Sequence, residues 1–165
     1  MIAVSNTSPL TNLAAIGQFG LLHRLFGNIC IPEAVWDELN AGDHSWPGRN
    51  EVAQSAWVQH HATQNHPLVT ALLRDLDRGE AESIALAIEL EADLILLDEK
   101  EGRRAAQRLG LRVVGVVGVL LQAKTAGLLD RVQPHLDALR QVAGFYLSES
   151  VYHHALLLAE EGDSS

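Results

Sequence analysis

Several features that would assign a function class directly are missing from this 165-residue sequence. It has one cysteine, so no disulfide can form within the chain, which suits a reducing cytosol. Because Cys30 stands between two isoleucines, we interpret it as a buried hydrophobic residue rather than a nucleophile. No run reaches the roughly 18 apolar residues of a membrane span, and no basic and then apolar leader follows Met1. We therefore expect a cytoplasmic protein without a membrane anchor.

Basic residues are also scarce, with 12 Lys and Arg against 21 Asp and Glu, and the formal net charge is −9. A protein that binds nucleic acid by general charge attraction has the opposite balance. If the substrate is RNA or DNA, metal ions and a local basic rim must therefore offset the repulsion. The 47% hydrophobic content and the length are those of a globular chain with one core, so we expect a single domain over residues 1–165.

Short apolar segments alternate with helical patterns along the chain. We expect strands at residues 2–5, 28–31, 57–60, 93–97 and 111–114, with the third at an edge of the sheet. We expect a first helix from Pro9, with Ser8 as its N-cap. Further helices are expected at 19–26, 32–39, 69–76, 79–91 and 99–109, over much of 115–147, and at 148–161. Residues 41–50 read as a polar loop. This alternation predicts a three-layer α/β/α fold around a mostly parallel sheet.

Oxygen-bearing side chains follow two of these strands. Asn6, Thr7 and Ser8 come after the first strand, and Asp98, Glu99 and Glu101 come after the fourth. Glu38 and Glu80 project from helices next to other strands. In parallel sheets ligands bind beyond the carboxyl ends of the strands, and hard divalent cations prefer oxygen ligands. Two such ions about 4 Å apart can stabilise the attacking and leaving oxygens of phosphodiester hydrolysis.

Each of these residues also has a structural interpretation. Asp77 and Glu80 have the spacing of a capping box, and so do Asp98 and Glu101. Ser8 fits a plain N-cap, and Glu38 fits a solvated glutamate. The hydroxyls of Thr7 and Ser8 could instead donate to a phosphate, and Arg103 and Lys124 could line an RNA path, although solvated helix faces explain both cations as well.

Four segments, in this order, resemble the successive motifs of PIN domains: NTSPL at 6–10, VWDEL at 35–39, GEAESIALA at 79–87 and DLILLD at 93–98. In addition, GVVGVLLQAK at 115–124 resembles a later motif of a PIN-like branch of nucleic-acid-binding proteins. The resemblance extends over residues 2–158. It implies the Rossmann-like, three-layer PIN fold over this length.

The resemblance also implies a Mg²⁺- or Mn²⁺-dependent ribonuclease that cleaves single-stranded RNA, often the toxin of a toxin–antitoxin pair similar to the VapBC systems. The catalytic and metal-binding positions of the family fall on Asn6, Glu38, Glu80 and Asp98, with Glu101 or Glu99 as a further candidate metal ligand. A small antitoxin protein and a second copy of the chain are the implied partners. A phosphatase or nucleotide-binding protein fits less well, because no phosphate loop follows a strand.

Asn6 departs from the family pattern, which has aspartate at this position. An amide oxygen can bind a hard cation but brings no negative charge, so metal affinity should be lower. A catalytically silent PIN-like module that binds nucleic acid or protein is therefore the second hypothesis. The net charge of −9 favours it as well.

Overall fold

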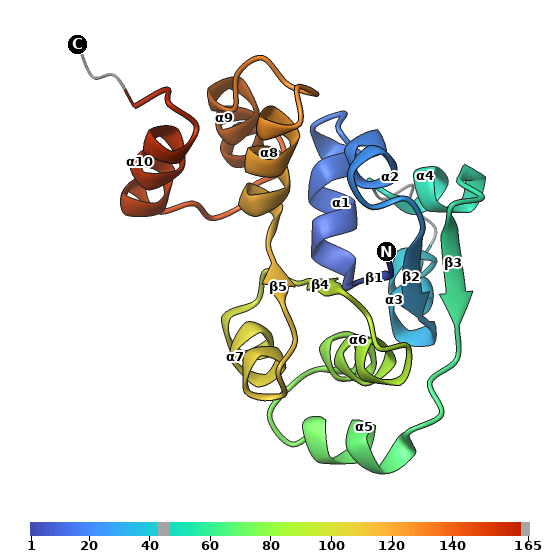
Figure 1. The fold of residues 1–165 in the computed structure, drawn as a ribbon. Helices are drawn as coiled ribbons and strands as arrows, with labels where there is room; N and C mark the ends of the chain where they lie inside the picture. Colours follow the sequence, from blue (N-terminus) through green and yellow to red (C-terminus); the bar gives the residue numbers. More distant parts are fainter. Residues whose placement is uncertain (43–46, 163–165) are drawn as a thin grey trace.

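The computed structural model describes residues 1–42 and 47–162, and five strands of this part form one sheet (Figure 1). The strand order is β3-β2-β1-β4-β5, and all neighbouring strands are parallel. The strands are β1 (Ala3–Ser5), β2 (Ile29–Pro32), β3 (Val58–His61), β4 (Leu94–Leu96) and β5 (Val113–Val114). Each lies within about two residues of its predicted bounds, and β3 is at an edge as predicted.

Helices cover both faces of the sheet, so the predicted three-layer α/β/α fold is confirmed (Figure 1). On one side lie α1 (Thr7–Ala15), α2 (Gly20–Phe26), α8 (Val116–Thr125), α9 (Gln133–Gln141) and α10 (Glu149–Leu158). On the other side lie α5 (His66–Leu72), α6 (Arg78–Glu89) and α7 (Lys100–Arg108), while α3 (Glu33–Leu39) and α4 (Arg49–Gln54) lie toward the β3 edge.

The alternation of side chains along each central strand divides the interior into two hydrophobic cores. Leu94 and Leu96 of β4 pack in the core under α1, α2 and α8, whereas Ile95 and Leu97 pack in the core under α6 and α7. Successive residues of a strand point to opposite faces, so a strand that is covered on both sides must be apolar throughout. This is why residues 94–97 gave such a clear sequence signal.

Sheet pairing places the ends of the two central strands side by side. Ser5 of β1 is in register with Leu96 of β4, and the Asn6 N–H donates to the Leu96 carbonyl at 3.0 Å. Residues Asn6 and Asp98 therefore leave the sheet at the same edge, although more than ninety positions separate them in the sequence.

The starts of two helices differ from the predictions. The helix predicted to start at Pro9 with Ser8 as N-cap begins at Thr7, with Asn6 as N-cap, because the chain turns directly from β1 into the helix. Pro9 is tolerated there because the first N–H groups of a helix have no partner within the helix. Helix α5 begins at His66 rather than Val69, since the Asn65 side chain accepts from the Leu68 N–H.

The segment predicted as a polar loop at 41–50 is only partly described, since residues 43–46 lie outside the described part. Its last two residues already belong to α4, which buries Val52. At the other end of the chain, α10 buries Ala155 and Leu156 but leaves Val151 and Leu158 exposed. Across residues 1–42 and 47–162, no helix has the length and apolar character to cross a membrane.

Candidate metal and nucleic-acid site

Asn6 and Glu38 meet at the first turn of α6. A Cβ placed on Gly79 would lie 3.0 Å from Asn6 Oδ1 and would also meet Glu38 Oε1, so both oxygens lie against the backbone of this glycine. Asn6 is 5% exposed, and its Oδ1 has no hydrogen-bond partner among the described residues. Burial of the Glu38 carboxylate raises its pKa, although the nearby Thr7 hydroxyl opposes this effect. A buried amide oxygen without a donor is costly and therefore marks a site that a further group can complete.

Glu80 forms the predicted capping box with one carboxylate oxygen and directs the other away from it. Its Oε1 accepts from the Asp77 N–H at 3.1 Å and its own N–H donates to Asp77 Oδ1 at 2.8 Å, so the capping box is present. Its Oε2 points instead toward α7, where a Cβ on Gly102 would lie 2.8 Å from it. Glu80 is 7% exposed, and burial raises its pKa, with additional repulsion from Asp77 and Glu99.

Asp98 does not cap α7, which contradicts the capping alternative for this residue. The N-cap of α7 is Glu99, and Asp98 Oδ1 instead accepts from the Val116 N–H at 3.0 Å, the first amide of α8. The second oxygen, Oδ2, is buried and has no hydrogen-bond partner among the described residues. Burial raises the pKa of Asp98 from 3.8 to about 6, while the Val116 N–H and the Arg103 guanidinium lower it.

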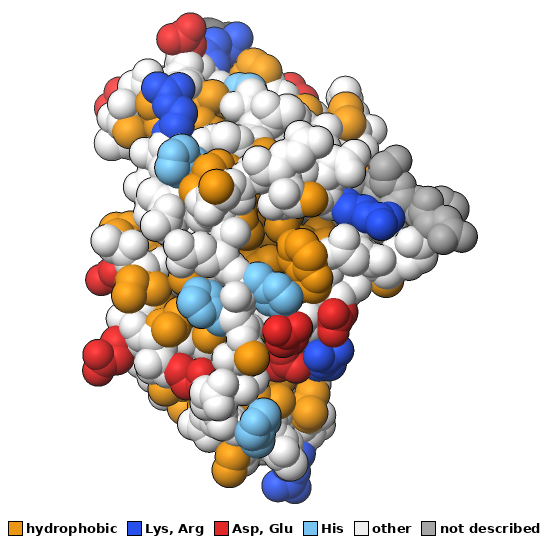
Figure 2. Space-filling model, turned by 90° about the vertical axis from the view of Figure 1, so that its right-hand side faces the viewer, with side chains coloured by type: hydrophobic (Ala, Val, Ile, Leu, Met, Phe, Trp, Pro, Cys, Tyr) orange, Lys and Arg blue, Asp and Glu red, His pale blue; other side chains and the backbone are white. Residues whose placement is uncertain are grey.

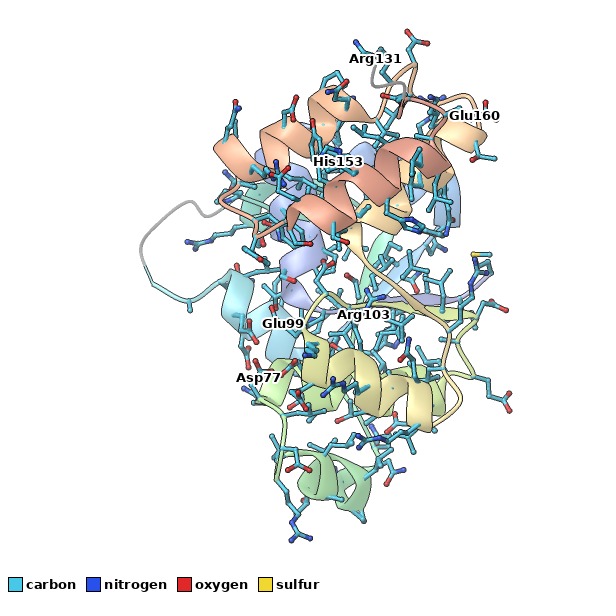
Figure 3. The ribbon with its side chains drawn as sticks, turned by 90° about the vertical axis from the view of Figure 1, so that its left-hand side faces the viewer. Asp77, Glu99, Arg103, Arg131, His153 and Glu160 are labelled. Carbon is cyan, nitrogen blue, oxygen red and sulfur yellow. The ribbon has the colours of Figure 1, made fainter. Side chains whose placement is uncertain are left out.

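Arg103 is the predicted cation that lies at this edge of the sheet. Its Nη1 donates to the Leu97 carbonyl at 3.2 Å, and a Cβ on Gly115 would come within 2.7 Å of Arg103 Nη1 and 2.6 Å of Asp98 Oδ1. The glycine at 115 therefore allows the aspartate and the guanidinium to approach the backbone between β5 and α8. Figure 3 shows Arg103 on the same face as Glu99 and Asp77, two further acids beside the site.

Two predicted residues lie away from Asn6, Glu38, Glu80 and Asp98. Glu101 is solvent-exposed on α7 and pairs with Arg104 at 3.4 Å, so its side chain does not join the others. Lys124 lies near the opposite end of α8, where it donates to the Ala159 carbonyl and pairs with Glu161 at 2.8 Å. Because α8 rises about 1.5 Å per residue, Lys124 is about 12 Å along the helix from Val116.

The predicted hydroxyls of Thr7 and Ser8 follow Asn6 at the start of α1. Thr7 lies near Glu38 and favours its charged form, although its geometry is not that of a full hydrogen bond. Ser8 Oγ is buried without a hydrogen-bond partner in the described part of the chain and does not act as an N-cap.

The sequence pattern did not reveal the roles of Glu82, Gly79 and Gly102. The Glu82 carboxylate is buried and accepts from the Ala34 N–H at 3.0 Å and from Arg78 Nε at 2.8 Å, which ties α6 to the start of α3. The glycines make room for Glu38 and Glu80. The only sequence signal for such a space-making role was a glycine next to acidic residues at the start of a predicted helix.

The side chains at this edge fit a cation that keeps much of its water. Within residues 1–42 and 47–162, no three side chains of His, Cys, Asp and Glu converge closely enough to form a metal cage by themselves. The donor set is nevertheless all oxygen, and Asn6 Oδ1 and Asp98 Oδ2 are buried without partners. Mg²⁺ uses one or two carboxylates and retains several waters, so this set suits it.

A family model described as a PIN domain matches residues 2–161. The chain belongs to the PIN-domain family. The resemblance found in the motifs is thereby confirmed, and the parallel sheet with its strand order agrees with it. Neither the curated proteins nor the solved structures include a match to this PIN domain.

Among the described residues, the surface of this PIN domain near β3 shows no continuous basic patch. Figure 2 shows hydrophobic and histidine side chains together on that face, with acidic groups beside them and isolated Lys and Arg. Here His60 stacks on Trp36 at 4.9 Å between ring centroids and pairs with Glu33 at 2.9 Å. A local basic rim, which the net charge of −9 makes necessary for nucleic acid, must therefore be sought elsewhere, and Arg103 lies on a different side of the molecule.

Proposed function

We propose that this PIN domain is a Mg²⁺- or Mn²⁺-dependent endoribonuclease that cleaves single-stranded RNA. The observation that carries the proposal is a pair of buried oxygens, Asn6 Oδ1 and Asp98 Oδ2, at the carboxyl edge of the two central strands, neither of which has a hydrogen-bond partner among the described residues. Structural hydrogen bonds account for one oxygen of Asp98 and one of Glu80, and the other oxygen of each carboxylate would be the one to bind a ligand.

Asp98, Glu80, Glu38 and Asn6 would hold the metal. When bound, it would activate water and neutralise charge on a phosphodiester. Burial raises the pKa of all three carboxyl groups by more than their hydrogen bonds lower it, and a bound cation would favour the charged form of each. Arg103 would place a positive charge next to Asp98, where a phosphate of the substrate would lie.

The resemblance to toxins of toxin–antitoxin pairs extends the proposal to partners. A small antitoxin protein would keep the enzyme inactive in the cytoplasm, and the enzyme would act as a homodimer. Co-purification of a small protein expressed from a neighbouring gene, with loss of cleavage in the complex, would support this part.

The second candidate is a PIN domain that binds RNA or protein without cleaving it. Asn6 favours it, because the amide leaves the cluster with one negative charge fewer than the family pattern. The overall charge of −9 favours it too, since cleavage requires the substrate to approach an acidic site.

The decisive experiment is cleavage of labelled single-stranded RNA by chelator-stripped protein, with and without added Mn²⁺, beside Asp98→Asn. Cleavage that requires the metal and falls at least about 100-fold in the variant supports the nuclease. Arg104→Gln is a matched control, because Arg104 is exposed on α7 and pairs only with Glu101 in the described chain. Absence of cleavage, together with equal Mn²⁺ affinity of parent and Asp98→Asn, would reject both the activity and the metal site.

A further inference from the structure

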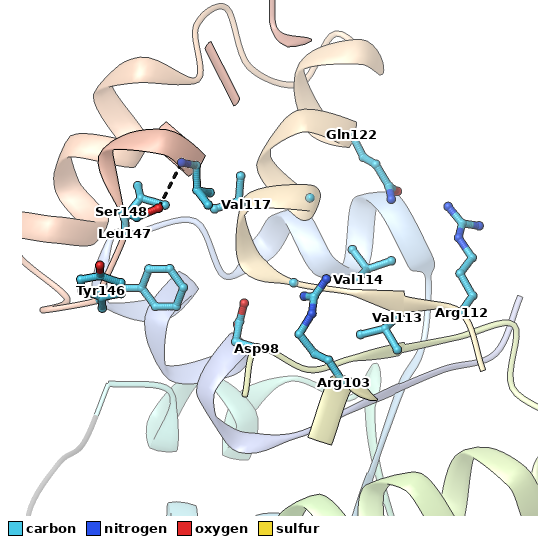
Figure 4. Close-up of a pocket in the computed structure, with 14 residues that line it drawn as sticks. Asp98, Arg103, Arg112, Val113, Val114, Val117, Gln122, Tyr146, Leu147 and Ser148 are labelled. Carbon is cyan, nitrogen blue, oxygen red and sulfur yellow. Dashed lines mark hydrogen bonds between the residues drawn. The ribbon is translucent and has the colours of Figure 1, made fainter. Parts of the chain in front are cut away.

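A cavity of about 550 Å³ opens directly beside Asp98, and Asn6, Glu38 and Glu80 are not among its lining residues. Figure 4 shows Tyr146 at one end and Arg112 at the other, with Asp98 and Arg103 between them. Four separate segments supply these residues: the end of β4, helix α7, the start of β5 and the connection between α9 and α10. Its floor and walls are apolar and include Val117, Phe145 and Leu147.

Tyr146 is unusually exposed for an aromatic residue beside such a cavity, with 85% of its surface accessible. Its backbone is nevertheless fixed on both sides. The Phe145 N–H donates to the Leu139 carbonyl at 2.8 Å, and the buried Leu147 accepts at its carbonyl from Arg140 Nε at 3.1 Å and Nη2 at 2.7 Å. The chain therefore presents the ring to solvent from a rigid support, which lowers the entropy cost of binding a ligand on it.

The charges of the cavity match a nucleic-acid strand. Arg103 and Arg112 face the cavity, and no hydrogen bond or ion pair engages the Arg112 guanidinium among the described residues. Arg103 lies beside Asp98, and Arg112 precedes β5 at the far end of the cavity, so together they supply positive charge along a cavity that begins at the acidic edge. An exposed aromatic ring next to a cationic path is the arrangement that binds unpaired bases.

We propose that one base of a single-stranded RNA stacks on Tyr146 and that the strand continues along the cavity, with its next phosphates on Arg103 and then on Arg112. This inference rests on the proposed function and deepens it, because it names the base next to the scissile phosphate as the group that the cavity recognises. Stacking accepts every base, so the site selects single strands over duplexes rather than a particular sequence. An RNA duplex keeps its bases paired and cannot offer one to Tyr146.

The proposed stacking of a base on Tyr146 is tested by measuring RNA binding and RNA cleavage separately. Fluorescence anisotropy with a labelled 12-nucleotide single-stranded RNA is recorded in chelator, where no cleavage occurs, for the parent, Tyr146→Ala, Tyr146→Phe and Leu73→Ala. Stacking predicts that Tyr146→Ala weakens binding by about 5- to 100-fold, whereas Tyr146→Phe stays within about twofold of the parent. Leu73 is a matched control, since it is an exposed apolar residue at the end of α5 outside this cavity.

A series of RNAs with one abasic position each gives an independent readout. For the parent, one position should weaken binding as much as Tyr146→Ala does, and that position should have no effect in the variant. Equal binding of parent and Tyr146→Ala, with metal-dependent cleavage intact, would overturn the stacking site alone and leave the cavity to a protein partner. Failure of the parent both to bind and to cleave RNA would overturn the stacking site and the proposed function together.

Discussion

Asp98 and Val116 are joined by a hydrogen bond of 3.0 Å across 18 positions of sequence, and this bond uses only one of the two oxygens of Asp98. The aspartate therefore has a structural side, toward the first turn of α8, and an unpartnered side, toward the site. Substitutions of Asp98 can test its hydrogen bond to Val116 and its proposed role as a metal ligand separately.

Asp98→Asn and Asp98→Ala should differ in stability but agree in function. Asparagine keeps an oxygen for the Val116 N–H, so we expect thermal unfolding to change by less than about 1 kcal/mol. Alanine leaves the N–H of the fully buried Val116 without a partner and should cost about 1–3 kcal/mol. Calorimetry gives the stabilities, and Mn²⁺ titration should show the same loss of affinity in both. Normal Mn²⁺ affinity in either variant would contradict a ligand role for Asp98.

Asn6→Asp should increase metal affinity and lower stability in chelator. The added carboxylate would lie beside Glu38 in a buried position, so repulsion and burial should destabilise the metal-free protein by about 1 kcal/mol. Bound cation removes this repulsion, and the affinity for Mn²⁺ should rise about tenfold or more. Isothermal titration and thermal shifts with and without Mn²⁺ measure both effects. A silent binding module would show the destabilisation without any gain in cleavage.

Gly79→Ala should remove function while leaving the fold intact. A Cβ at this position would meet the Glu38 carboxylate, the end of a flexible side chain that can rotate outward, and would lie 3.0 Å from Asn6 Oδ1, which need shift only slightly. Alanine is also favoured over glycine in a helix by roughly 0.5–1 kcal/mol, so the unfolding temperature should not fall. We expect at least about tenfold weaker Mn²⁺ binding. Gly20→Ala is the control, since Gly20 also starts a helix and has open space around it; equal Mn²⁺ affinity of the two variants would argue against Glu38.

Glu161 should make stability depend on pH at the acidic end. Burial alone favours its neutral form, but hydrogen bonds from Lys124, Val132 and Gln133 outweigh this and lower its pKa below 4.5. A lowered pKa in the folded state means that the stabilisation is present above pH 4.5 and is lost as pH falls through the folded value. Glu161→Gln should cost about 1.5–3 kcal/mol at pH 7. Its stability should also fall less than that of the parent between pH 6 and about pH 3, as measured by urea unfolding.

Cys30 should be unreactive until the protein unfolds. The residue is 6% exposed in β2, and burial raises the pKa of its thiol, so both access and thiolate content are low. A maleimide reagent should label it at least about 100-fold more slowly in buffer than in 6 M guanidinium chloride, as followed by mass spectrometry. Rapid labelling of the native protein would contradict the buried, structural interpretation of this cysteine.

The sequence was most informative where the physical cause is local. Residues 94–97 are apolar on both faces and Glu80 lies three positions after Asp77, so the strand and the capping box could both be predicted. Helix α4 could not, because it buries only Val52 and has no apolar periodicity. The partner of Asp98 and the ion pair of Lys124 with Glu161 depend on contacts between distant segments, which no local pattern encodes.

The central position of β1 has a consequence for biosynthesis. Strand β1 is made first, yet it pairs with β4, whose first residue is Leu94, and the Ile2 N–H donates to Asp93 at 2.6 Å. Such a contact between distant residues closes a long loop and forms late in folding. A nascent chain therefore carries Asn6, Glu38 and Glu80 long before Asp98 can join them, and the candidate site cannot assemble until most of this PIN domain has been synthesised.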